Sequence, residues 1–112
     1  MLTVALILFA LAAVIGIILA VMHIKKKTVS IPYALSHGIV AATGLVLLLL
    51  SYAQGTAAVG LPLLLFVIAA LGGFVLFTAH LRARPLPVPL IVIHAVVAVS
   101  AFALLIYQVL LA

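Results

Sequence analysis

The chain has 112 residues, of which 71% are hydrophobic and only 4% are charged. It contains five lysines and arginines, four histidines and no aspartate, glutamate or cysteine, so its formal net charge is +5. Soluble domains are about half apolar, which excludes that class, and the lack of cysteine excludes disulfides and thiolate metal sites. With no carboxylate to orient an imidazole, hydrolase and transferase mechanisms find no support.

Four long apolar segments follow one another along the chain. They cover residues 2–24, 33–53, 59–81 and 88–111. About 20 helical residues cross the hydrocarbon core of a bilayer, so each segment is long enough to span it. Because these segments use nearly the whole sequence, we predict one all-α domain over residues 1–112, an integral membrane four-helix bundle of up-down-up-down topology.

The basic residues lie in two of the three connections between the segments: Lys25, Lys26, Lys27, Arg82 and Arg84. The first segment therefore differs from a cleaved signal peptide, in which positive charge precedes the apolar stretch. The positive-inside rule predicts cytoplasmic basic loops and external termini, as in a bacterial inner membrane protein. Positive charge held against a membrane favours lipid headgroups or acidic cofactor groups as partners, rather than nucleic acid.

A shift of 57 residues superimposes the first half, residues 1–56, on the second half, residues 57–112. It places His23 on His80 and His37 on His94. Further residues meet an identical residue under the same shift: Leu6, Leu8, Phe9, Ala12, Ala13, Gly16, Pro32, Val40, Ala41, Leu47 and Leu48. We therefore predict two copies of one helical hairpin, related by an axis along the membrane normal.

Candidate metal ligands are the four histidines, His23, His37, His80 and His94. His23 and His80 lie near the ends of the first and third segments. His37 and His94 lie near the starts of the second and fourth segments. At 1.5 Å per residue, all four imidazoles are expected in one layer near the cytoplasmic face. Ionisable residues within membranes usually face the bundle interior and mark functional sites. The alternative is a histidine that only bonds a carbonyl or water near the interface.

Small residues stand seven positions from three of these histidines, on the same helix face. Gly16 precedes His23, Gly73 precedes His80, and Gly44 follows His37. Turned inward, such faces would leave an upright slot for a flat ligand. The alternative explanation is close helix packing through small residues, which is common in membranes.

Haem b matches these features, because its iron takes two neutral imidazoles and its anionic propionates suit the basic loops. On the histidines and their glycine spacing, the chain resembles the membrane b-type cytochromes with a cytochrome b561-like four-helix core. The resemblance implies one or two haems and electron transfer rather than a stand-alone enzyme. It also implies a quinone or a redox protein as partner. Both a homo-oligomer and a larger complex are compatible with the resemblance. Those families commonly place histidines at two depths, whereas a single layer suits electron exchange on the cytoplasmic side.

Two other functions stay open from the sequence. Four imidazoles could bind or carry zinc or copper, although the outer half of the chain supplies no acid for an ion path. A non-catalytic accessory subunit could dock a soluble partner on the basic loops. Small multidrug exporters share the length and the four segments, but their mechanism needs a glutamate in the first helix, and this chain has none.

Overall fold

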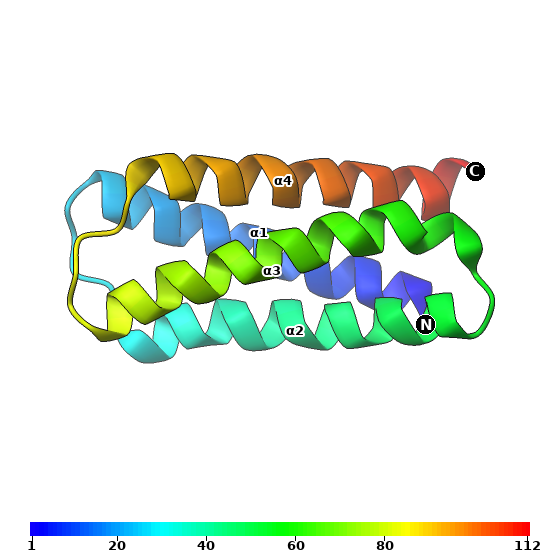
Figure 1. Cartoon of the computed structure of the whole chain (residues 1–112), viewed down its shortest axis with the longest axis horizontal. Coiled ribbons are helices and arrows are strands. Elements are labelled where there is room, and N and C mark those ends of the chain that lie inside the picture. Colours follow the sequence, from blue (N-terminus) through cyan, green and yellow to red (C-terminus); the bar gives the residue numbers. More distant parts are fainter.

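A computed structural model describes residues 1–112 as four long helices joined by short connections (Figure 1). The helices are α1 (Leu2–Ile24), α2 (Ile31–Ala53), α3 (Gly60–Leu81) and α4 (Val88–Ile106). A single 3-10 turn, η1 (Ala57–Val59), precedes α3, and a π-helical turn, η2 (Tyr107–Leu111), extends α4. The predicted all-α fold is confirmed, and all four helices are long and apolar enough to cross a membrane.

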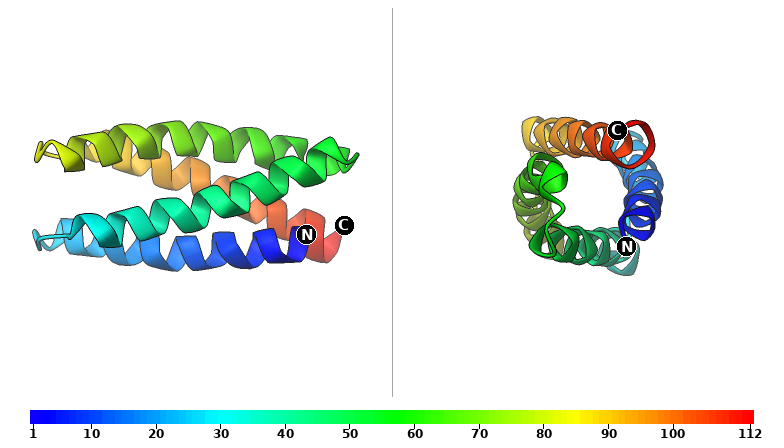
Figure 2. Two further views of the ribbon diagram at one scale, coloured as in Figure 1. Left: turned by 90° about the horizontal axis from the view of Figure 1, so that it is seen from below. Right: turned by 90° about the vertical axis from the view of Figure 1, so that its right-hand side faces the viewer.

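The bundle is elongated, with extents of 42 × 20 × 19 Å. The connections that contain the basic residues lie together at one end, here called the basic end, and both chain termini lie at the other (Figure 1). α1 packs along α2, and α3 packs along α4. Toward the terminal end, α2 crosses to approach α3, and α4 crosses to approach α1 (Figure 2). The two hairpins are therefore joined mainly at the terminal end and stand apart at the basic end.

The packed core lies in the half of the bundle that contains the termini. Its buried residues are Ala5, Phe9, Leu48, Val59, Leu63, Phe66, Ala101 and Leu105. At the edge of the core that faces the basic end, the rings of Phe9 and Phe66 stack with centroids 3.8 Å apart and planes 5° from parallel. Stacked aromatic rings bury a large apolar area and add a modest pairing energy, so this pair holds α1 and α3 together across the bundle.

Most large apolar side chains point away from the bundle. Only 13 of the 112 residues are buried, and residues such as Ile17 and Leu71 are 64% and 61% exposed. A soluble protein rarely exposes continuous apolar surface, whereas hydrocarbon solvates it without cost. The exterior therefore suits a lipid environment, as the length and composition of the helices do.

α1 and α3 end in the same hydrogen-bonded turn. The amide of Lys27 donates to the carbonyl of Met22, and the amide of Arg84 donates to that of Ala79, each over 2.9 Å. The residue before each donor has a left-handed backbone, with φ of 56° at Lys26 and 50° at Ala83. This is the Schellman ending of a helix, which usually places glycine at the left-handed position.

Because alanine is strained at a left-handed position, Ala83→Gly is expected to stabilise the protein. Relief of about 1–2 kcal/mol of strain is partly offset by the extra freedom of glycine in the unfolded chain. The net gain should be about 0.5–1 kcal/mol, measured as a higher melting temperature of the purified protein in detergent. Ala103→Gly, within α4, is the control and should lower the melting temperature. A melting temperature that falls in both variants would contradict the assignment of strain to Ala83.

Candidate functional site

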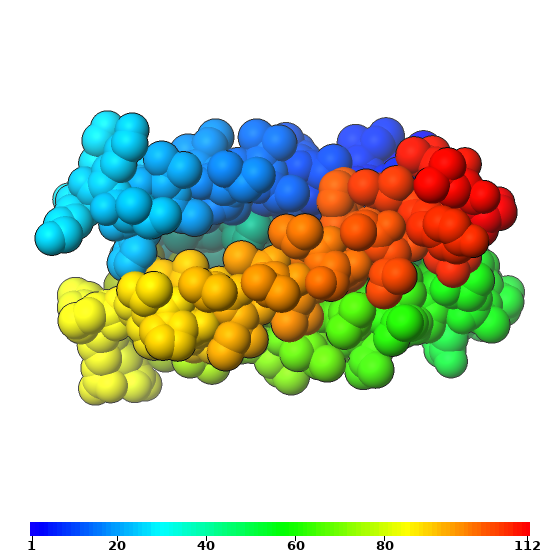
Figure 3. All heavy atoms as spheres, turned by 90° about the horizontal axis from the view of Figure 1, so that it is seen from above, coloured from blue at the N-terminus to red at the C-terminus, as the bar shows by residue number.

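A cavity of about 810 Å³ separates the two hairpins in the half of the bundle nearer the basic end. Its walls are mostly apolar, and all four histidines line it. Lys27 and Arg84 line it at the basic end, and Phe9 and Phe66 line it where the packed core begins. The surface is hollowed between α1 and α4 on this half, so the cavity is open at its side (Figure 3). A size of this order and an apolar wall with few polar groups are typical of small-molecule sites.

Much of the cavity wall consists of residue pairs that lie 57 positions apart. The pairs include Phe9 and Phe66, Ala12 and Ala69, Gly16 and Gly73, His23 and His80, Lys27 and Arg84, His37 and His94, and Ala41 and Ala98. Equivalent positions of the two hairpins thus face the same space. The cavity presents nearly the same chemistry from both sides.

His37 and His94 make the same hydrogen bond, each within its own hairpin. Nδ1 of His37 lies 2.8 Å from the carbonyl oxygen of Ala12, and Nδ1 of His94 lies 2.7 Å from that of Ala69. A carbonyl only accepts, so Nδ1 carries the hydrogen and donates it. In a neutral imidazole the other nitrogen, Nε2, then keeps its lone pair and can bind a metal.

Glycine makes room for each of these rings on the neighbouring helix. A Cβ atom added to Gly16 would lie 2.9 Å from Cε1 of His37, and one added to Gly73 would lie 3.1 Å from Cε1 of His94. Both distances are shorter than an ordinary van der Waals contact. The two glycines therefore seat the histidine of the partner helix, instead of leaving free space above the histidine of their own helix.

Gly44 has a different neighbour. A Cβ atom there would lie 3.2–3.3 Å from three carbon atoms of the Phe9 ring. Gly44 is buried and does not line the cavity. It lets the ring of Phe9 approach α2, and so belongs to the packed core.

The histidines lie at two levels, so the expectation of a single layer is wrong. The ring of His37 packs against Gly16, seven residues before His23 on α1. Seven residues of helix correspond to about 10 Å. His37 and His94 form the deeper pair, and His23 and His80 lie nearer the basic end. An estimate of depth from the sequence counts residues from the end of each apolar segment and assumes that these ends lie at the same level. It therefore misses the difference in depth, which depends on the register between the paired helices.

The deeper histidines approach each other across the bundle. Their ring centroids are 6.4 Å apart and their planes are inclined at 80°. In the shallower pair, Nε2 of His80 is buried and has no hydrogen-bond partner. Buried polar atoms are nearly always paired, so this unpaired nitrogen, in a residue that lines the cavity, is an exception within the site.

Only part of the predicted basic set reaches the cavity. Lys27 and Arg84 line it, whereas Lys25, Lys26 and Arg82 do not. The carbonyl oxygens that orient the deeper histidines and the stacked phenylalanines were not predicted. The identity of Phe9 with Phe66 in the repeat was the one available signal for the aromatic pair.

No match to this chain was found among protein-family models, curated proteins or solved structures. No three histidines come close enough together to hold a metal ion as one cluster. A tetrahedral site made of four imidazoles would require the helices to move.

The seating of His37 predicts the effects of adding one methyl group at different glycines. Gly16→Ala should force the His37 ring to shift and destabilise the protein by about 1–3 kcal/mol. Gly73→Ala should have a smaller effect, because its contact is longer. Gly38→Ala is the control, since nothing lies within 4 Å of a Cβ atom there. Thermal unfolding of the purified variants measures this order, and equal melting temperatures for Gly16→Ala and Gly38→Ala would contradict it.

Proposed function

We propose that this chain is a membrane b-type cytochrome whose cavity holds haem b between His37 and His94. The observation that carries the proposal is the matched pair of imidazoles, one from each hairpin. Each has Nδ1 fixed on a backbone carbonyl and Nε2 left free. Metal-binding histidines usually donate their second nitrogen in this way, which fixes the tautomer and the ring orientation.

The separation of the two rings suits two ligands of one iron. Metal–nitrogen bonds of about 2 Å, with each nitrogen about 1 Å from its own ring centre, place opposed ligand rings about 6 Å apart. The centroids of the two rings are 6.4 Å apart. Of the pairings that the sequence allowed, His37 and His94 would therefore be the two residues that hold the iron.

The rest of the cavity also suits haem. Its wall is apolar and includes the small residues Ala41 and Ala98, each four residues after a deeper histidine. Lys27 and Arg84 at the basic end provide positive charge for two propionates. His23 and His80 lie between the deeper pair and this charge, where they can donate hydrogen bonds to an anionic group or bind a second haem.

Haem held in this way supplies reversible one-electron transfer between its ferric and ferrous states. The protein contributes the fixed imidazoles, an apolar wall that excludes water and a positive charge at the basic end. The stacked rings of Phe9 and Phe66 mark the start of the packed core. With haem in the cavity, electrons would be exchanged on the side of the basic loops, with a quinone or a redox protein, rather than across the whole bundle.

The proposed setting is a bacterial inner membrane. Four helices of sufficient length would cross it as an up-down-up-down bundle of two repeated hairpins, with the basic loops in the cytoplasm. Homo-oligomers and larger redox complexes are both compatible with the apolar exterior. The proposal requires only that one chain provide both axial ligands.

Single histidine variants test the ligand assignment. His37→Ala and His94→Ala should each lose most bound haem, because one imidazole is too few for bis-histidine ligation. His23→Ala and His80→Ala should keep the deeper haem. The measurement is a pyridine haemochrome assay with protein quantitation on purified protein, which gives the haem stoichiometry.

Thr43→Val, on the outer surface of α2, is the matched control and should bind as much haem as the unmodified chain. Its hydroxyl donates to the carbonyl of Ile39 and faces away from the cavity. Purified wild-type protein without a haem spectrum after expression with haem supplied would refute the proposal. Full haem content in His37→Ala and His94→Ala would remove these residues as ligands.

A further inference from the structure

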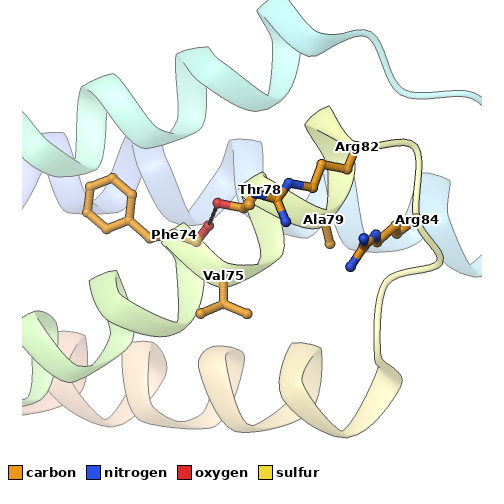
Figure 4. A pocket seen from close by; sticks show the side chains of 6 residues that line it. All are labelled: Phe74, Val75, Thr78, Ala79, Arg82 and Arg84. Atoms are coloured by element: carbon orange, nitrogen blue, oxygen red, sulfur yellow. Dashed lines mark hydrogen bonds between the residues drawn. The ribbon is translucent and has the colours of Figure 1, made fainter.

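A second hollow lies on the outer surface of α3 and the connection that follows it. It is a groove of about 330 Å³, lined by Phe74, Val75, Thr78, Ala79, Arg82 and Arg84. Figure 4 shows Arg82 extending back beside Thr78, with Phe74 and Val75 further from the connection. The groove is thus apolar at one end and carries two guanidinium groups at the other.

The guanidinium groups have no acidic partner within the chain, which contains no aspartate or glutamate. The terminal carboxylate lies at the opposite end of the bundle (Figure 1). The hydroxyl of Thr78 donates its hydrogen to the carbonyl of Phe74, over 2.8 Å. Its oxygen can then only accept a hydrogen bond, as from an arginine. The negative charge that neutralises Arg82 and Arg84 must therefore come from another molecule.

We propose that this groove binds one anionic phospholipid. Its phosphate would be held by Arg82, with the charge of Arg84 beside it, since guanidinium groups bind phosphate through paired hydrogen bonds. One acyl chain would lie along Phe74 and Val75, which are 70% and 56% exposed. Along α3 the charged residues lie at the end of the helix and the apolar residues lie further into it, as the headgroup and acyl chain of a phospholipid do in one leaflet. Basic sites at the membrane surface attract anionic lipids.

The first hairpin provides an internal comparison. The positions equivalent to the groove carry Ile17, Ile18, Val21, Met22, Lys25 and Lys27. The only other hollow in the protein is the central cavity, so the outer surface of the first hairpin has no such groove. Lysine lacks the planar pair of donors that arginine offers, and Val21 replaces the hydroxyl of Thr78. Binding should therefore be specific to the second hairpin.

The turn that ends α3 fixes the arginines in place. The amide of Arg84 is bonded to the carbonyl of Ala79, and the amide of Arg82 to that of Thr78. Both bonds join the connection to residues that line the groove. The backbone that carries the two guanidinium groups is therefore hydrogen-bonded to the last turn of α3.

The test uses the full chain purified in detergent and titrated with dioleoyl phosphatidylglycerol, with bound lipid counted by native mass spectrometry. Arg82→Gln should weaken binding by about tenfold, as expected for the loss of a charge-assisted contact. Lys25→Gln removes the same charge at the equivalent position of the first hairpin and should change the affinity less than twofold. Arg82 is the chosen site because Arg84 also lines the central cavity.

Equal losses in Arg82→Gln and Lys25→Gln would overturn the proposal, because they would reveal only general attraction to positive charge. Unchanged binding in both variants would also overturn it. With the unmodified chain, dioleoyl phosphatidylcholine should bind about tenfold more weakly than phosphatidylglycerol, and equal affinities would refute the anionic preference. Millimolar inorganic phosphate should leave the lipid bound, and complete displacement would identify a site for free phosphate instead.

The lipid readouts do not depend on haem. Arg82→Gln should keep the haem content of the unmodified chain, because Arg82 does not line the central cavity. Failure of the lipid proposal would leave the cytochrome proposal standing. The reverse is also true, since the groove needs only α3 and its connection.

Discussion

The hydrogen bond between an imidazole and the backbone of the neighbouring helix is the contact on which the site depends. In each hairpin it joins the second helix to the first, and a glycine next to the carbonyl leaves room for the ring. The bond therefore sets the distance and the register of the two helices. It also fixes the tautomer of the neutral ring, since Nδ1 donates and Nε2 keeps its lone pair, so helix packing and the state of the imidazole depend on the same atoms.

The two ends of the bundle are built differently. At the terminal end, stacked phenylalanines and fully buried leucines fill the space between the hairpins. At the basic end the same space is a cavity lined by histidines. Large side chains near the chain termini and small ones beside the histidines produce this difference. The packed core at the terminal end holds the two hairpins together. The half that contains the cavity therefore does not have to contribute to their association.

The fold could be predicted closely from the sequence, because membrane helices are determined by length and hydropathy. α2 begins at Ile31, two residues before the predicted start, since Pro32 is tolerated in a first helical turn, where its missing amide hydrogen is not needed. The site was less predictable. The relative depths of His37 and Gly16 depend on the register and the rotation of the two helices in a hairpin. Hydropathy determines neither the register nor the rotation. Gly44 likewise could not be assigned to Phe9 without knowing which helix faces it.

The contacts that link the two hairpins have a consequence for how such a protein could arise. Phe9 meets Phe66 and His37 meets His94, so each residue faces its own counterpart. That is the rule of an isologous interface, in which two identical subunits present the same patch to each other. A peptide of half this length, paired with a second molecule of itself, would enclose an equivalent chamber. Fusion of two such chains would then allow equivalent positions to differ, and Lys25 and Arg82 are one pair of equivalent positions that carry different residues.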